Sequence, residues 1–350
     1  MNLALFLPNW VGDVVMATPA IRVLRKHIGV GRLVGVMRPY VGEVLGGSTW
    51  FDDTILYAKK SDKPELRWAA VRERLRAERF DAAVLLTNSL RTGWMAYQSG
   101  ARERVGMAAN LRSPLLTTRI YAPRKGWRRI TLPAIDAYLN IVQAAGCGPE
   151  SPTLELVTTP ADEQAADAAW ARLGLSSHDR VAVFNTGGAF GAAKDWPAGH
   201  FAELARRLVR EQGVKVLINC GPAERESARK IAAATNDARV MTLADEPQLP
   251  IGLTKAAIRR ASLLVSTDSG PRFFGLAFGV PTVTLFGPTS THFTRSYSPV
   301  ETSLSLGLDC QPCMARSCPL THHRCMKDMS VERVYAAATT ALAQQARLVA

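Results

Sequence analysis

Short apolar runs alternate with amphipathic segments along most of the chain. The runs have the length and aliphatic content of buried strands. They occupy residues 3–7, 33–37, 54–57, 82–86, 181–184, 215–219, 239–242 and 263–266. The amphipathic segments carry apolar residues at helical spacing and occupy residues 14–27, 64–79, 132–145, 198–211, 223–234, 252–260 and 331–348. This alternation predicts parallel sheets covered by helices, which is the α/β class of fold.

The alternation is interrupted between residues 146 and 160. This stretch is rich in glycine and proline, and it surrounds a short apolar segment, residues 154–156, which we expect to form a strand. A chain of 350 residues is long enough for two domains. We therefore predict two doubly wound domains, residues 1–160 and residues 161–350. Two such domains are expected to face a cleft, where a ligand site is most often found.

A short polar loop, residues 267–270, follows the apolar run that ends at Ser266. An apolar segment of helical length comes next and closes at Pro281. Free backbone N–H groups and the positive end of a helix dipole at such a loop suit an anionic ligand such as a diphosphate. The simpler alternative is a tight turn between strand and helix, with Asp268 as the N-cap.

A second loop, residues 185–197, follows another apolar run and contains glycines at positions 187, 188 and 191. Glycine lets the backbone approach a ligand closely, and Lys194 supplies a compact positive charge of the kind that binds phosphate. Pro197 suits the first turn of the next helix. The loop lacks the Gly-Lys-Ser/Thr ending of a P-loop and the spacing of a dinucleotide fingerprint. It nevertheless strengthens the case for an anionic ligand.

The third element is at the N-terminus, where a strand over residues 3–7 is followed by a loop over residues 8–13 and then by a helix. This order places Asp13 at the mouth of a parallel sheet, where α/β enzymes keep their sites. The alternative role for Asp13 is that of a helix N-cap.

Together these stretches resemble the lipopolysaccharide heptosyltransferases, glycosyltransferase family nine. The resemblance runs nearly from end to end. Its most specific parts are residues 12–20, the glycine-rich loop up to Pro197, and residues 267–289. Any single match would be weak, but several in the same order are specific. The similarity is greatest to the heptosyltransferase II branch.

The resemblance implies a GT-B fold, with two Rossmann-like domains facing an interdomain cleft. The first domain would bind the acceptor and the second the nucleotide sugar. It implies an inverting transfer of heptose from ADP-L-glycero-D-manno-heptose to the inner core of lipopolysaccharide, with a Kdo/heptose-lipid A acceptor. Such a transfer needs a carboxylate that removes the acceptor proton, and cations or helix dipoles that hold the leaving diphosphate. No Asp-x-Asp metal motif follows a strand, so we expect no cofactor in catalysis.

The resemblance also implies roles for individual residues. It assigns the general base to Asp13 and a diphosphate contact to Lys194. The donor-binding positions are Thr186, Gly187, Gly188, Asp268, Ser269 and Gly270. The acceptor-side positions are Asn88, Ser89 and Arg91. Arg91 could hold an acceptor carboxylate or phosphate, although this stretch could also be a simple strand-end loop. Glu224 is a candidate for the ribose hydroxyls of the donor, or else a first-turn helix carboxylate.

Two positions depart from the family pattern. The family more often has proline where this chain has Thr186. The family often continues Asp-Ser-Gly-x-x with histidine, whereas this chain has Phe273 there. A histidine would donate a hydrogen bond near the leaving group, and phenylalanine cannot. Arg272 could supply a charge instead, although adjacent residues of a helix point in different directions.

Composition limits the class of protein. With 47% hydrophobic and 21% charged residues, the chain has the composition of a soluble globular protein. No apolar run approaches the roughly 20 residues that span a bilayer, so we expect no transmembrane segment. No signal peptide is recognised at the N-terminus. We therefore expect a cytoplasmic protein.

The formal net charge of +13 is concentrated in residues 1–150. A basic half implies an anionic partner. We do not expect a nucleic acid, because the sequence contains no recognised nucleic-acid module. An anionic glycolipid fits better, so we expect a peripheral protein at the inner face of the inner membrane. The alternative is a solvated basic surface.

Four of the six cysteines lie in a short segment near the C-terminus. They are Cys310, Cys313, Cys318 and Cys325. A cytoplasmic location argues against disulfides, and four thiols with two nearby histidines suit a structural Zn²⁺. An iron–sulfur cluster and a loop of reduced thiols are the alternatives. We expect Cys147 and Cys220 to be ordinary buried thiols.

Two other functions remain open from the sequence. One is a related GT-B enzyme, such as a sugar-nucleotide epimerase or a transferase that uses another nucleotide sugar. The other is a catalytically silent sugar-nucleotide-binding homologue, which Phe273 suggests. Release of ADP that depends on the acceptor and on Asp13 would be expected only of a transferase.

Overall fold

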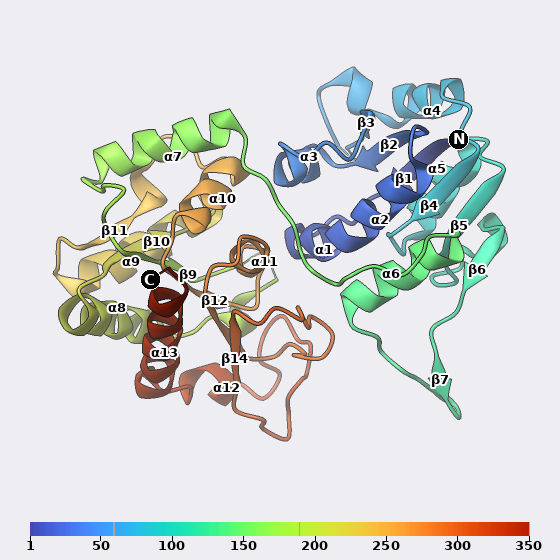
Figure 1. The fold of residues 1–350 in the computed structure, drawn as a ribbon. Helices are drawn as coiled ribbons and strands as arrows, with labels where there is room; N and C mark the ends of the chain where they lie inside the picture. Colours follow the sequence, from blue (N-terminus) through green and yellow to red (C-terminus); the bar gives the residue numbers. More distant parts are fainter. Residues whose placement is uncertain (59, 189, 350) are drawn as a thin grey trace. The chain divides into compact units, whose positions relative to one another are not determined.

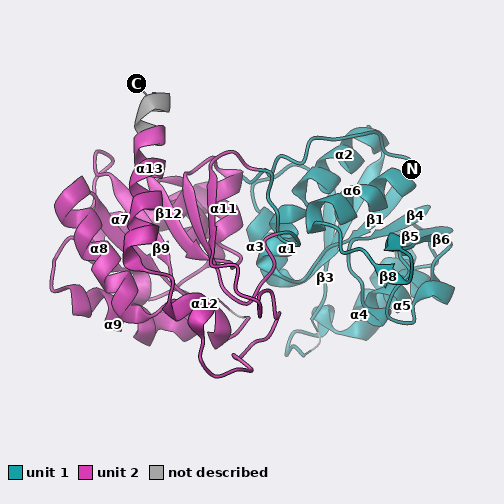
Figure 2. Cartoon of the chain, turned by 90° about the horizontal axis from the view of Figure 1, so that it is seen from below, with its two compact units in different colours: residues 1–157, 292–297 teal, residues 158–291, 298–350 magenta. Residues whose placement is uncertain are grey.

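The computed structural model describes residues 1–58, 60–188 and 190–349. The chain divides into two compact units (Figures 1 and 2). Unit 1 comprises residues 1–157 and 292–297, and unit 2 comprises residues 158–291 and 298–350. The short segment 292–297 joins unit 1 through hydrogen bonds. The Ala134 N–H donates to the Phe293 carbonyl at 2.9 Å, and the Tyr297 hydroxyl donates to Asp136 at 2.7 Å.

Unit 1 is built on a six-stranded parallel sheet in the order β3-β2-β1-β4-β5-β6. Its strands are β1 (Asn2–Phe6), β2 (Arg32–Met37), β3 (Asp53–Leu56), β4 (Ala82–Leu85), β5 (Glu103–Met107) and β6 (Thr118–Ile120). Its helices are α1 (Val11–Met16), α2 (Thr18–Ile28), α3 (Pro39–Leu45), α4 (Trp68–Ala77), α5 (Leu90–Gln98) and α6 (Ala134–Ala144), with short 3-10 turns η1 (Pro64–Leu66) and η2 (Ser113–Leu115). A separate antiparallel hairpin consists of β7 (Arg124–Lys125) and β8 (Arg128–Arg129).

Helices cover both faces of this sheet. Ala4 and Phe6 of β1 share a core with Leu75 of α4 and Met95 of α5. Because successive strand residues point to opposite faces, Leu5 lies on the other face, where α2 and α6 pack together. Burial of both faces explains why these strands are continuous apolar runs in the sequence.

Unit 2 repeats the same plan, with a six-stranded parallel sheet in the order β11-β10-β9-β12-β13-β14. Its strands are β9 (Val181–Asn185), β10 (Lys215–Asn219), β11 (Val240–Thr242), β12 (Leu263–Thr267), β13 (Thr282–Phe286) and β14 (Glu301–Ser305). Its helices are α7 (Pro160–Arg172), α8 (Ala198–Gln212), α9 (Arg225–Thr235), α10 (Ile251–Arg259), α11 (Arg272–Ala277), α12 (Arg324–Lys327) and α13 (Val331–Val349), with 3-10 turns η3 (Ala192–Lys194), η4 (Pro222–Glu224) and η5 (Leu243–Asp245).

The C-terminal helix α13 belongs to unit 2. It packs on α8 and against β12, β13 and β14. Val334 and Ala338 of this helix share a core with Phe184 of β9 and Phe201 of α8. In the described part of the chain, no helix combines the length and the hydrophobicity that crossing a bilayer requires.

Both sheets have the strand order of the doubly wound nucleotide-binding fold, so the predicted α/β class with two Rossmann-like halves is confirmed. The order reverses between β1 and β4 in unit 1, and between β9 and β12 in unit 2. Ligands of such sheets bind at the carboxyl ends of the strands beside this switch point. In unit 1 the segments that follow these strands carry Asp13 and Asn88, and in unit 2 they carry Lys194 and Asp268.

Three expectations about local structure are wrong. The helix expected over residues 64–79 is the turn η1 followed by α4, because Arg67 between them has extended backbone angles. Residues 154–156 form no strand. Their leucines are buried, but the Glu155 N–H donates to the Thr18 hydroxyl at 3.1 Å and joins no sheet. The helix expected over residues 14–27 is two helices, α1 and α2, because Pro19 in the first turn of α2 has no N–H with which to continue α1.

Candidate active site

Asp13 lies in the first turn of α1, just beyond the carboxyl end of β1. The N-cap of this helix is Trp10, with extended backbone angles of φ −95° and ψ 137°, so the N-cap role considered for Asp13 is wrong. Burial, and then the charge of Asp13, raise the pKa of Tyr138 in α6 well above its ordinary value. This part of unit 1 therefore holds a half-buried carboxylate near a phenol that stays protonated.

The loop after β4 places Asn88, Ser89 and Arg91 at the start of α5. Ser89 is the N-cap of this helix, and its hydroxyl accepts the Thr92 N–H at 3.2 Å. Asn88 and Arg91 are exposed, and the Arg91 guanidinium lies 5.9 Å from the centroid of the Tyr57 ring. Ser89 thus has a structural task, whereas Asn88 and Arg91 present polar groups at the surface.

Arg112, which the sequence did not single out, is completely buried behind Asn88. Its Nε donates to the Met107 carbonyl at 2.9 Å, and its Nη2 donates to Asn88 Oδ1 at 3.4 Å. Among the described residues its Nη1 has no hydrogen-bond partner, and no acidic side chain forms an ion pair with it. Burial lowers the pKa of Arg112 to about 10. A buried charge without a counter-ion is costly, and here it adds positive potential beside the predicted acceptor position.

In unit 2, Lys194 and Asp268 form an ion pair that joins the two predicted phosphate loops. The Lys194 Nζ lies 3.3 Å from Asp268 Oδ2 and also donates to the Asp268 main-chain carbonyl. The same ammonium lies 4.5 Å from the centroid of the Phe190 ring. Both side chains of the pair are largely buried, with exposures of 13% and 4%. The glycine-rich loop and the loop over residues 267–270 are therefore neighbours.

Asp268 is also held by Arg272. The Arg272 Nη1 lies 2.8 Å from Asp268 Oδ1, while its Nε and Nη2 donate to the Glu301 carboxylate at 2.6 and 3.0 Å. Helix α11 has Pro271 as its N-cap, so the N-cap role considered for Asp268 is wrong. Burial works to raise the pKa of Asp268, but the charges of Arg272 and Lys194 outweigh burial and lower it. The carboxylate is therefore ionised at neutral pH.

Phe273, at the position where the family often has histidine, is buried beside this cluster. Its side chain is 2% exposed, and the Arg272 guanidinium lies 4.6 Å from its ring centroid. Arg272 itself is buried and engaged by Asp268 and Glu301. It therefore supports the loop from behind and does not replace a histidine that would face a ligand.

Two predicted glycines lie where neighbouring side chains closely approach the backbone. A Cβ on Gly188 would lie 3.0 Å from the Ser269 Cβ, and a Cβ on Gly187 would lie 2.6 Å from Glu224 Oε1. The Glu224 carboxylate accepts the Gly221 N–H at 2.8 Å. Glu224 thus makes the local contact of a first-turn carboxylate and also lies against the glycine-rich loop.

A cavity of about 590 Å³ adjoins the glycine-rich loop. The predicted residues that line it are Thr186, Gly187, Gly188 and Glu224. His323, expected beside the cysteines, also lines it, together with three polar residues that the sequence did not single out: Asp195, Ser227 and Lys327. Burial raises the pKa of Asp195, and the charge of Glu224 adds to this rise. The volume is that of a small-molecule site. The loop over residues 267–270, including Gly270, adjoins Gly188 through Ser269.

A buried amide network, not expected from the sequence, fixes the strand ends below these loops. The Asn185 Nδ2 donates to Ser269 Oγ at 2.8 Å and to the Gly187 carbonyl at 3.1 Å. Asn219 donates to Asn185 Oδ1 at 2.9 Å, and the Thr254 hydroxyl donates to Asn219 Oδ1 at 3.1 Å. Satisfied buried networks of this kind hold a site rigidly, so both loops start from a fixed frame.

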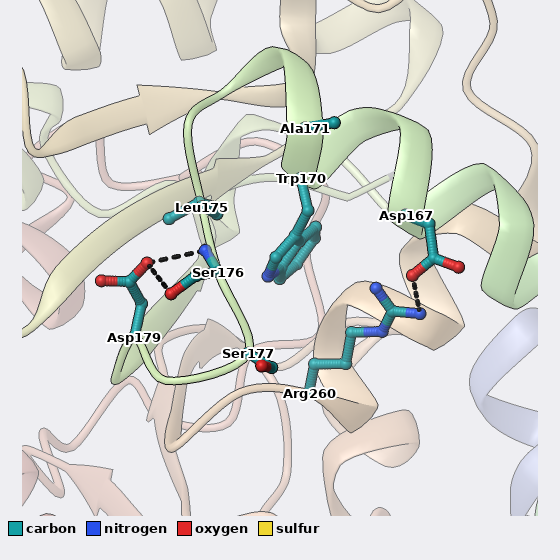
Figure 3. Close-up of a pocket in the computed structure, with 8 residues that line it drawn as sticks. All are labelled: Asp167, Trp170, Ala171, Leu175, Ser176, Ser177, Asp179 and Arg260. Atoms are coloured by element: carbon teal, nitrogen blue, oxygen red, sulfur yellow. Dashed lines mark hydrogen bonds and ion pairs between the residues drawn. The ribbon is translucent and has the colours of Figure 1, made fainter.

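A second hollow of about 570 Å³ lies between α7 and the segments that precede β9 and β12 (Figure 3). Arg260 pairs there with Asp167 at 2.8 Å, and the Ser176 N–H and hydroxyl donate to Asp179 at 2.7 and 2.9 Å. These polar groups satisfy one another. The hollow also lies at the amino ends of the strands, away from the edge where such sheets bind ligands. It is not the candidate site.

The four clustered cysteines line one small cavity of about 20 Å³, together with His322 and His323. The four are Cys310, Cys313, Cys318 and Cys325. Burial raises the pKa of Cys325, and its three neighbouring thiols add to the rise. In the part of the chain that the structure describes, no group of three or more His, Cys, Asp or Glu side chains is arranged to hold a metal ion. Cys147 and Cys220 are buried free thiols, as expected.

The cysteine segment, residues 310–325, is bonded to the glycine-rich loop. The Ala193 N–H donates to the Arg316 carbonyl at 3.0 Å, and the His323 Nε2 donates to the Ala193 carbonyl at 2.8 Å. Gly191 has a φ of +140°, and a Cβ there would lie 2.6 Å from the Arg316 carbonyl oxygen. The segment therefore supports the loop directly beside Lys194.

The sequence model of glycosyltransferase family 9 (heptosyltransferase) matches residues 68–323 of this chain. Lipopolysaccharide heptosyltransferase 2 of Escherichia coli strain K12 is 26% identical over 307 residues, which cover 85% of this chain and 86% of that protein. Lipooligosaccharide heptosyltransferase 2 of Campylobacter jejuni is 31% identical over 161 residues. That alignment covers 46% of this chain and 50% of the Campylobacter protein, about half the length of each.

Solved structures agree with these matches. A family 9 glycosyl transferase from Veillonella parvula has a TM-score of 0.85 at 25% identity and covers 98% of this chain and 97% of its own. The Escherichia coli heptosyltransferase WaaC, solved with ADP, has a TM-score of 0.73 at 17% identity and covers 97% of this chain and all of its own. The predicted GT-B class and the predicted resemblance to heptosyltransferase II are confirmed.

Proposed function

The chain belongs to glycosyltransferase family 9, the heptosyltransferases, and we propose that it is an inverting transferase that moves heptose from ADP-L-glycero-D-manno-heptose to the inner core of lipopolysaccharide. The observation that carries this proposal is the ion pair of Lys194 with Asp268 at the switch point of unit 2. It joins two loops whose cation and backbone N–H groups suit a diphosphate.

On the donor side, the diphosphate would lie against Lys194 and the backbone N–H groups of Ser269 and Gly270. An ammonium has three donors, and Asp268 engages two through its carboxylate and its carbonyl, so a third is left for a phosphate oxygen. Arg272 fixes the Asp268 carboxylate from the other side. The ammonium is thus positioned before the donor binds, and it can stabilise the charge that develops on departing ADP.

On the acceptor side, Asp13 would be the general base. Its carboxylate would take the proton of the acceptor hydroxyl as that oxygen attacks the anomeric carbon. The bond from the anomeric carbon to the diphosphate oxygen breaks, and its electron pair leaves with ADP. Asn88 and Arg91 would bind the anionic acceptor, with Arg112 holding the Asn88 amide.

We assign Thr186, Gly187, Gly188 and Glu224 to the nucleotide sugar, because they line the cavity of about 590 Å³. The bound ADP of WaaC supports an ADP sugar as the donor. Calorimetry against ADP, UDP, GDP and CMP sugars tests this choice. We expect tight binding of the ADP sugar and weak binding of the other three. A preference for a sugar linked to another nucleotide would point to a different transferase or to an epimerase.

Phe273 is the one observation that favours a catalytically silent homologue, because it removes a hydrogen-bond donor near the leaving group. Turnover decides between the two functions. A transferase releases ADP only when donor and acceptor are both present, and only with Asp13 intact. A silent homologue binds the donor and releases no ADP.

We further propose that the enzyme works at the inner face of the inner membrane, where a lipid-linked acceptor would be found. The excess of basic residues in the first half of the chain supports an anionic membrane surface as its partner.

We also propose a structural Zn²⁺ at Cys310, Cys313, Cys318 and Cys325. Four thiols around one small cavity supply the donor set of a closed tetrahedral site, although they would have to draw together to bind the ion. Bound metal would fix the cysteine segment and, through the Ala193 bonds to Arg316 and His323, the loop that carries Lys194. The ion would take no part in the transfer.

A further inference from the structure

The β7–β8 hairpin stands apart from the sheet of unit 1, and Figure 1 shows it extending away from β6. Arg124 pairs with Arg129, and Lys125 pairs with Arg128. Gly126, with a φ of +61°, and Trp127 form the turn. The Ile130 N–H donates to the Pro123 carbonyl at 2.8 Å and closes the base of the hairpin.

The tip of this hairpin is apolar and completely open to solvent. Trp127 is 97% exposed, and Tyr121 and Ile130, which flank the strands, are 67% and 42% exposed. A tryptophan is among the least favourable side chains to leave in water, because it is large and most of its surface is apolar. Exposed apolar side chains of this size at the end of a protruding hairpin indicate a binding surface that a partner covers.

Four basic residues flank Trp127 in the sequence, and residues 121–130 contain no acidic residue. All four are exposed, and in the described part of the chain none of them takes part in an ion pair. They are Arg124, Lys125, Arg128 and Arg129. The strand register places like charges directly opposite each other in both pairs, an arrangement that destabilises a hairpin in water. A negatively charged surface would offset this repulsion, because it attracts all four basic side chains.

We propose that the hairpin docks unit 1 on an anionic phospholipid bilayer. Trp127 would enter the boundary between headgroups and acyl chains, and the four basic side chains would contact lipid phosphates. An amphipathic ring flanked by long basic side chains is the pattern of a membrane-interface anchor. The inference rests on the proposed function only for the identity of the membrane, which would be the one that carries the acceptor.

Vesicles without any acceptor test the docking by itself. The protein should sediment with vesicles of equal parts phosphatidylcholine and phosphatidylglycerol, but not with pure phosphatidylcholine. Added salt should weaken the binding, because it screens exposed charges. Tryptophan emission should shift to the blue on binding, and Trp127→Ala should abolish that shift.

Matched charge variants locate the surface. Arg124→Gln with Arg128→Gln should lower vesicle affinity by about 30-fold, since each basic side chain at an anionic surface contributes roughly fivefold. The control is Arg72→Gln with Arg102→Gln, which removes the same charge from exposed positions elsewhere in unit 1. This control should bind nearly as well as the wild type. Because the altered side chains are exposed, all variants should melt at the wild-type temperature.

Three results would overturn the proposal. The hairpin variants could bind vesicles as the wild type does, or the control could lose as much affinity as the hairpin variant. The third result is that the protein binds a single-stranded oligonucleotide through the hairpin and does not bind vesicles. Calorimetry with ADP-heptose on the same preparations separates this inference from the proposed function. If the wild-type protein binds vesicles but not ADP-heptose, only the proposed transferase function is refuted. If it binds ADP-heptose but not vesicles, only the proposed role of the hairpin is refuted.

Discussion

The Lys194 Nζ lies 3.3 Å from the Asp268 Oδ2, although 74 positions separate the two residues in the chain. The distance is short because β9 and β12 are adjacent at the point where the strand order of unit 2 reverses. Each strand delivers its own loop to the same edge of the sheet. A cation and a row of backbone N–H groups therefore meet at one place, which is the arrangement that a diphosphate requires.

Lys194→Ala should weaken the binding of ADP-heptose by about 1.5–3 kcal/mol, the worth of one hydrogen bond to a charged group. The fold should survive, because Arg272 still pairs with Asp268. Calorimetry measures the affinity. The control is Lys215→Ala, which removes the 2.9 Å ion pair with Asp179 at the other end of the sheet and should leave donor affinity unchanged. Equal affinity in both variants would remove Lys194 from the site.

Asp13→Asn should lower the rate of heptose transfer by about 10²–10⁴-fold, because the amide keeps the shape of the side chain but accepts no proton. Donor affinity and melting temperature should change little. Since Trp10 is the N-cap of α1, loss of a cap would not explain a fall in rate.

Asp81→Asn provides the matched control for Asp13. It neutralises an exposed carboxylate of unit 1 at the amino end of β4, and turnover should be normal. A fully active Asp13→Asn enzyme would refute the proposed mechanism and would direct the search toward another carboxylate or histidine.

Much of the fold could be predicted because the strands of these sheets are buried on both faces and follow each other regularly. The strands that escaped prediction include β5 and β14, which lie at or near the sheet edges. β14 is Glu-Thr-Ser-Leu-Ser, and only its leucine is buried, so no apolar run marks it. β13 is a different case, because all of Thr282–Phe286 is buried and its apolar pattern could have been recognised.

The positions of Asp13, Lys194 and Asp268 near strand ends were predictable, because each follows an apolar run in the sequence. The candidate site was not predictable where tertiary packing makes the environment. Nothing in the sequence marks Arg112 as buried, and Gly93 and Gly106 leave room for its side chain, because a Cβ on either glycine would lie 3.1 Å from an Arg112 atom. In the same way, nothing in the sequence shows that His323 bonds to Ala193.

Acid should reveal the charge state of Asp268. Because its folded pKa lies below the ordinary value of 3.8, the ionised carboxylate stabilises the fold above pH 3.8. That stabilisation is lost as the pH falls through the folded pKa. At neutral pH, Asp268→Asn should therefore destabilise the protein. The loss in free energy of unfolding should be smaller than the value of about 3–5 kcal/mol that is typical when a buried charge loses its only partner, because Glu301 still pairs with Arg272.

Melting curves recorded from neutral pH downward check this prediction. The difference between wild type and Asp268→Asn should narrow below pH 3.8. Asp245→Asn, which breaks an exposed ion pair with Arg229, should show a small difference throughout. A difference between wild type and Asp268→Asn that does not depend on pH would show that folding leaves the pKa of Asp268 unchanged.

Metal removal should act on stability and on the donor site together. If the cysteine cluster binds Zn²⁺, protein prepared anaerobically without added metal should carry close to one ion per chain, and a chelator should lower its melting temperature. The chelated protein should also bind ADP-heptose more weakly, because the cysteine segment holds Ala193 beside Lys194 through Arg316 and His323. Cys313→Ser should reproduce both effects. Cys147→Ser, at a buried thiol outside the cluster, should retain the metal and the donor affinity. Elemental analysis that finds neither zinc nor iron would refute the metal site, and a metal-free protein with full donor affinity would refute its link to the Lys194 loop.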